Sequence, residues 1–83
     1  MDQTQAVENS LKAVVAKVLQ IPEDRVRPEC RFKEDLGADS LDLVLLLYEI
    51  EDRLGFAIPD EDAKQLATVA DATRLALRLL NRT

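Results

Sequence analysis

The 83-residue sequence predicts an all-α fold, a small bundle of three main helices plus one short helix. Of its residues, 47% are apolar and only two are glycine, a balance that favours a compact helical globule over disorder. Apolar residues also recur at helical spacing in three segments, which proline or glycine separates. The length allows a single domain over residues 1–83, with loose ends expected at 1–3 and 81–83.

The first helix is expected to end at Leu19, and Asp2 or Thr4 is its expected N-cap. Its apolar residues follow the spacing i, i+4, i+7, i+8, i+11 and i+12, which places them on one stripe of a helix. We assign this stripe to the core. It consists of Val7, Leu11, Val14, Val15, Val18 and Leu19.

The segment 20–38 is expected to be a long loop, because Pro22 and Pro28 prevent one continuous helix from crossing it. Loops of this length in compact domains are usually functional or held by their own side chains. We expect apolar anchors to hold this one and Gly37, without a side chain, to permit a close turn before Ser40. The anchors are Val26, Phe32 and Leu36.

The second helix is predicted from Ser40 to Leu54, with Asp39 as N-cap and Gly55 just past its end. It carries two apolar faces where a surface helix needs one. Some of the second face must therefore meet solvent, a partner or a bound chain. The first face is Leu43, Leu46, Leu47, Ile50 and Leu54, and the second is Leu41, Val44, Leu45 and Tyr48.

After an apolar link, in which Phe56 and Ile58 are expected in the core, Asp60 is the expected cap of a short helix through about Leu66. Thr68 and Asp71 then have the spacing of a capping box. A last helix should follow to about Leu80. Its expected stripe is Val69, Ala72, Ala76, Leu79 and Leu80, with Leu75 at the margin.

Ser40 stands at the start of the second helix, where free backbone N–H groups and the helix dipole stabilise an anion such as phosphate. A catalytic serine needs a base, and the chain has no histidine; Lys33, the nearest lysine, lies beyond the loop. On these residues alone, a serine that merely helps to start a helix is the favoured interpretation.

Charge is distributed unevenly along the chain. Residues 34–62 hold ten acidic residues and one basic residue, whereas the remainder holds six acidic and ten basic residues. Such an acidic face disfavours nucleic acid as a partner. It favours steering toward basic patches on proteins over a merely solvated surface.

Other features exclude several classes of protein. No apolar run is long enough to span a membrane, and no signal peptide opens the chain, so a cytoplasmic protein is expected. Cys30 is the only cysteine, which excludes an intrachain disulfide and a zinc cluster. With no histidine and no glycine-rich phosphate loop, an enzyme is the least favoured class.

The segment Asp35-Leu36-Gly37-Ala38-Asp39-Ser40-Leu41-Asp42 resembles the attachment motif of the acyl carrier protein family. The resemblance extends over roughly residues 7–80, through Ile21 to Val26, Phe32 to Gly37, and Ile58 to Ala63. It implies the carrier-protein bundle. It also implies a 4′-phosphopantetheine group bound to Ser40 through a phosphodiester, with Gly37, Asp39 and Leu41 around it.

The resemblance implies a carrier without catalytic turnover of its own, for fatty-acid, specialised lipid or polyketide synthesis. Its partners would be a holo-carrier synthase and acyl-loading and acyl-using enzymes with basic or apolar docking patches, and a monomer is the simplest expectation. The expected recognition residues are Asp35, Asp42, Val44, Leu45, Tyr48, Glu49, Glu51 and Asp52. Alternatives are a peptidyl or D-alanyl carrier, or a helical adaptor in which Ser40 stays unmodified.

The sequence departs from the family pattern at two positions of the second helix. Leu45 stands where glutamate is common, and Leu43 stands where a small polar residue is common. We hypothesise that the partners present a more apolar surface than those of a housekeeping fatty-acid carrier. The alternative is that Leu43 or Leu45 turns into the core.

Overall fold

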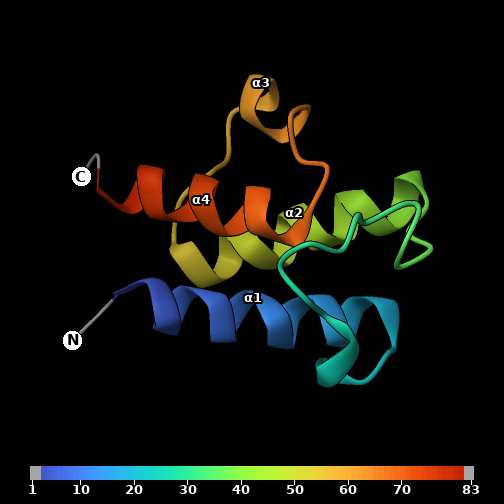
Figure 1. Ribbon diagram of the computed structural model, residues 1–83. Coiled ribbons are helices and arrows are strands. Elements are labelled where there is room, and N and C mark those ends of the chain that lie inside the picture. Colours follow the sequence, from blue (N-terminus) through green and yellow to red (C-terminus); the bar gives the residue numbers. More distant parts are fainter. Residues whose placement is uncertain (1–2, 82–83) are drawn as a thin grey trace.

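A computed structural model describes residues 3–81 and confirms the all-α prediction. Three main helices, α1 (Gln3–Leu19), α2 (Ser40–Leu54) and α4 (Val69–Leu80), form the bundle, and α1 packs against both others. The short helix α3 (Asp60–Ala63) stands off the bundle, and the 3₁₀ helix η1 (Glu23–Arg25) follows α1 (Figure 1). In the described part of the chain, no helix is long and apolar enough to cross a membrane.

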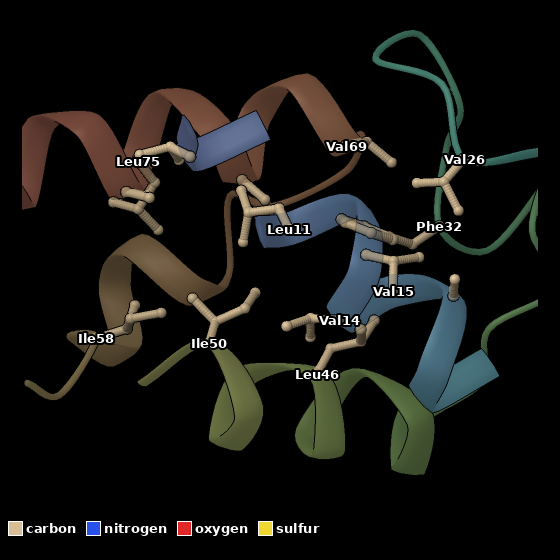
Figure 2. Packing of buried hydrophobic residues seen from close by; sticks show 14 of the residues in the cluster. Leu11, Val14, Val15, Val26, Phe32, Leu46, Ile50, Ile58, Val69 and Leu75 are labelled. Carbon is tan, nitrogen blue, oxygen red and sulfur yellow. The ribbon is translucent and has the colours of Figure 1, made fainter. Parts of the chain in front are cut away.

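The core lies where the three main helices meet, and the long loop contributes to it (Figure 2). Val14 and Val15 of α1 are almost fully buried against α2 and α4. Leu46 and Ile50 of α2 belong to the same cluster, as the first apolar face predicts. Leu75, expected at the margin of the last helix, is instead only 5% exposed, because α4 turns most of its apolar side chains toward the bundle.

The ends of α1 differ in part from expectation. Thr4 lies inside the helix, so it is not the N-cap; Asp2, the other expected cap, lies outside the described residues. Of the residues expected to be loose, Gln3 begins α1 and Asn81 is the C-cap of α4, while 1–2 and 82–83 are not described. At its C-terminus α1 is followed by Gln20, whose φ of 58° is left-handed.

The loop between α1 and α2 is held by its own buried side chains and by backbone hydrogen bonds to the chain at the start of α4. Val26 and Phe32 are 2% and 3% exposed and Leu36 is half-buried, as expected of anchors. The loop also pairs with the chain just before α4. The Phe32 N–H donates to the Ala67 carbonyl at 3.0 Å, and the Val69 N–H donates to the Cys30 carbonyl at 3.0 Å.

In the link from α2 to α4, the predicted N-cap of the short helix is wrong. Pro59, and not Asp60, is the N-cap residue of α3, since the extended backbone of the proline leads directly into the helix and Asp60 is its first residue. The helix proper ends at Ala63, although turns with i to i+3 hydrogen bonds continue to Leu66. Thr68 and Asp71 do form the expected capping box at the start of α4.

Candidate functional site

Ser40 is the first residue of α2 and is exposed. The residues around it form a capping box, as their spacing allows. The Asp42 N–H donates to Asp39 Oδ1 at 2.8 Å, and the Asp39 N–H donates to Asp42 Oδ2 at 3.2 Å. Asp39 is thus the N-cap that the sequence predicts, and Ser40 is left with its hydroxyl uncommitted to capping.

The capping box leaves two backbone donors available next to the hydroxyl. The N–H groups of Ser40 and Leu41 donate to no protein acceptor in the described part of the chain, since the capping box engages only those of Asp39 and Asp42. Unpaired N–H groups at a helix N-terminus suit phosphate oxygens. The residues at the start of α2 therefore fit a phosphate ester on Ser40.

The backbone path that leads to Ser40 depends on Gly37 and Ala38. Gly37 has a φ of 72°, a conformation that residues with side chains rarely adopt, and a Cβ there would meet nothing within 4 Å. The glycine is thus required by its backbone angle and not by crowding. Ala38 is buried, and its N–H donates to the Phe32 carbonyl at 2.8 Å. The buried anchor Phe32 thereby fixes the chain two residues before Ser40.

The second apolar face of α2 is exposed along its whole length. Its members are Leu41 (66% exposed), Val44 (43%), Leu45 (44%) and Tyr48 (65%), and we call them the α2 strip. Leu43 behaves differently, because it is half-buried and packs against the core. Of the two departures from the family pattern, only Leu45 therefore enlarges the apolar surface.

The acidic side chains expected to recognise partners are engaged to different degrees. Asp42 is held in the capping box, and Asp35 Oδ2 accepts the Arg31 N–H at 2.8 Å. Glu51 Oε2 accepts the Ile58 N–H at 2.7 Å, so this carboxylate anchors the link that follows α2. A seven-residue separation across a turn gives no pattern from which this contact could be predicted.

The remaining two acidic residues lie further along α2. Glu49 Oε1 lies 3.5 Å from Lys17 Nζ of α1. Asp52 is exposed and makes no ion pair or side-chain hydrogen bond with any described residue. Asp52 is therefore the recognition candidate whose charge is least compensated.

A small apolar cavity of about 40 Å³ lies between α2 and the α3 segment. It begins at Leu43, one turn after Ser40, and the core residues Phe32 and Ile50 lie at its inner side. The other lining residues are Leu46, Leu47, Ala63 and Leu66. Only an apolar group would enter such a cavity without losing hydrogen bonds to water.

The surroundings of Ser40 do not provide catalytic machinery in the described part of the chain. The sequence has no histidine to serve as a base, and residues 3–81 contain no group of three or more acidic or cysteine side chains that could hold a metal ion. Cys30 is half-buried, with its Sγ 3.6 Å from the Arg25 carbonyl oxygen.

Comparison with known proteins defines the class of this domain. Residues 9–76 match the family model described as a phosphopantetheine attachment site. A helical bundle with this match is a phosphopantetheine-dependent carrier domain, and its cofactor is covalently attached 4′-phosphopantetheine.

Curated relatives narrow the class further. The chain is 44% identical over 69 residues to an acyl carrier protein of Wolinella succinogenes, covering 83% of this chain and 91% of that one. It is 46% identical over 71 residues to an acyl carrier protein of Thermosynechococcus vestitus, covering 86% of each. The solved structure of "a putative acyl carrier protein" from Mycobacterium tuberculosis superposes with a TM-score of 0.81 at 31% identity, over 88% of this chain and 97% of that one. The chain belongs to the acyl carrier protein family, whose members carry acyl groups as thioesters on phosphopantetheine and are not themselves catalysts.

Proposed function

We propose that Ser40 is the residue to which 4′-phosphopantetheine is attached. The observation that carries this proposal is an exposed serine at the first position of α2, beside two backbone N–H groups without protein acceptors. Only one other serine, Ser10, occurs in the sequence, and it lies within α1. Ser10 is surrounded by helical backbone whose N–H groups are already paired, so it lacks the features of Ser40.

The residues near Ser40 have separate tasks in this proposal. The N–H groups of Ser40 and Leu41 stabilise the phosphodiester, while Asp39 caps the helix and keeps its first turn in place. Gly37 gives the loop the turn that delivers Ser40 to the surface. The attached group supplies a thiol for acyl groups, and the apolar cavity that Leu43 lines offers shelter for an acyl chain.

Partner enzymes meet the carrier on the α2 strip and on the acidic residues around it. Steering by this surface requires basic and apolar patches on those enzymes. The proposal includes a holo-carrier synthase and acyl-loading and acyl-using enzymes as partners. The carrier itself performs no turnover, works in the cytoplasm as a monomer, and serves fatty-acid, specialised lipid or polyketide synthesis.

The test is the intact mass of the purified protein after incubation with coenzyme A and a broad-specificity phosphopantetheinyl transferase. The wild type should gain the mass of one phosphopantetheine, and Ser40→Ala should gain none. Ser10→Ala is the matched control, and it should be modified like the wild type. No gain by a folded wild-type protein would instead support an unmodified helical adaptor, and a gain by Ser40→Ala would exclude Ser40 as the site.

A further inference from the structure

An open groove of about 300 Å³ lies between α1 and α2, on the side where the α2 strip is exposed. Two of its lining residues, Lys17 and Val18, come from α1. The others come from α2 and are Leu45, Tyr48, Glu49 and Asp52. A role for α1 outside the core could not be predicted, since Val18 belongs to the apolar stripe assigned to the core.

The groove combines an apolar floor with charged edges. Val18 is half-buried against the core, while the side chains of Leu45 and Tyr48 are exposed beside it. At the edge, Lys17 neutralises Glu49 across a Nζ–Oε1 distance of 3.5 Å. Asp52 also lines the groove, and no described residue forms an ion pair with it. An occupant that matches this surface is apolar in its centre and positively charged where it meets Asp52.

We propose that partner enzymes of this carrier insert one apolar side chain into the groove and pair a neighbouring lysine or arginine with Asp52. This inference rests on the proposed carrier function and extends its docking surface from α2 onto α1. The α2 strip connects the groove to Ser40 without interruption. Along a helix that rises 1.5 Å per residue, Asp52 is about 18 Å from Ser40.

That separation lies within one ordinary protein interface, which covers about 800 Å² on each partner. An enzyme with its active site at Ser40 can therefore reach the groove with the same face. The apolar side chain would exclude water near Asp52, and the ion pair would gain strength from the lower local polarity. The groove would thus contribute to the binding of a partner enzyme at a distance from the reacting group.

The test compares Val18→Ser with Leu19→Ser, its matched control. Both residues are half-buried and pack against the core, but only Val18 lines the groove. Circular dichroism and thermal unfolding would establish that each variant is folded. Two rates are then measured as kcat/KM, namely modification by a broad-specificity phosphopantetheinyl transferase and fatty-acid loading of the holo protein by an ATP-dependent acyl-carrier ligase.

Val18→Ser should lower at least one of these rates about fivefold or more relative to Leu19→Ser, and Asp52→Asn should lower the same rate and its dependence on salt. Equal rates for both serine variants in both reactions would overturn the proposal. If Val18→Ser does not fold, unchanged rates for Tyr48→Ser, which alters an exposed side chain, would overturn it. Failure of the carrier function is a separate result, since the wild type would then gain no phosphopantetheine.

Discussion

At the scale of single residues, the two longest described helices are each followed by a left-handed residue, and the two residues differ in kind. Gly55 follows α2 with a φ of 83°, while Gln20 follows α1 with a φ of 58°. The Ile21 N–H donates to the Ala16 carbonyl at 3.0 Å, a hydrogen bond that requires Gln20 to keep this conformation. A left-handed conformation costs a residue with a side chain roughly 1–2 kcal/mol, so α1 bears a strain that α2 avoids.

Gln20→Gly should therefore raise the free energy of unfolding by about 1 kcal/mol, because glycine adopts this conformation without a steric penalty. Urea denaturation followed by circular dichroism would measure the change. The opposite substitution, Gly55→Ala, should lower stability by a similar amount, since a Cβ there meets nothing within 4 Å and only the backbone angle is unfavourable. A Gln20→Gly variant that is less stable than the wild type would contradict this account.

Asp71 shows how one carboxylate can stabilise a helix start. Its side chain accepts hydrogen bonds from the N–H groups of Thr68 and Ala67, and these bonds, with help from Arg74, hold the pKa of Asp71 below its ordinary value. A carboxyl whose pKa is lowered on folding stabilises the protein above its unfolded-state pKa. That stabilisation disappears as the pH falls through the lowered pKa of the folded state.

Asp71→Asn should consequently reduce stability at pH 7, where the wild-type carboxylate is ionised. Asparagine still accepts hydrogen bonds, so the difference reports mainly the charge. The difference between the two proteins should shrink as the pH is lowered below about 4, the ordinary range of aspartate. Denaturant unfolding at pH 7 and at pH 3 would test this, and a gap of constant size would exclude the ionised carboxylate as its source.

Caps of this kind can be predicted from the sequence when the capping side chain accepts a hydrogen bond from the backbone of its own helix turn. Asp39, Thr68 and Asp71 are placed by spacing alone. Asp60 was wrongly expected to cap α3, because the preceding proline already occupies that position. The contact of Glu51 could not be predicted from spacing, since its side chain accepts from a backbone N–H that only the tertiary turn brings near it.

At the scale of elements, α2 is predictable because its pattern contains two apolar faces. One face enters the core through Leu46 and Ile50, and the α2 strip remains at the surface. The pairing of the long loop with the start of α4 could not be predicted. Backbone hydrogen bonds such as that from Phe32 to Ala67 depend on chain geometry and carry no side-chain pattern.

Helix α3 is the element with the least support, because it packs extensively against none of the other helices. An ion pair connects it to the bundle, with Arg78 Nη2 of α4 lying 3.0 Å from Asp62 Oδ1. Arg74 is also on α4 but pairs with Asp71 of the same helix. These two arginines therefore form a matched pair, one that reaches α3 and one that does not.

Arg78→Ala should speed amide hydrogen exchange in residues 62–66 by about two- to fivefold, as expected for loss of an exposed ion pair. Exchange in the core of α1 should change little. Arg74→Ala should leave residues 62–66 at wild-type rates. Hydrogen–deuterium exchange with mass spectrometry can measure both, and equal effects of the two variants would show that the Asp62 pair does not hold α3.

At the scale of the whole molecule, the distribution of charge matters more than its total. The net charge is −5, yet residues 34–62 are far more acidic than this and the remainder is positive. Ser40, the α2 strip and Asp52 all lie within the acidic part. A basic partner should therefore be drawn to the face that it modifies, whereas the basic remainder of the chain would not attract it.

Two double variants separate distribution from total charge. Glu49→Gln with Asp52→Asn removes two charges from α2, and Glu23→Gln with Asp24→Asn removes two from η1, which packs against α1. Both variants change the net charge equally. At low ionic strength, the first variant should lower kcat/KM for phosphopantetheinyl transfer about three- to tenfold, when the transferase has a basic docking face. The second variant should have little effect.

The loss for the first variant should fade as the salt concentration is raised, because salt screens the attraction between the wild-type protein and the transferase. Equal losses for both variants would mean that partners respond only to total charge, and the acidic segment around Ser40 would then have no steering role.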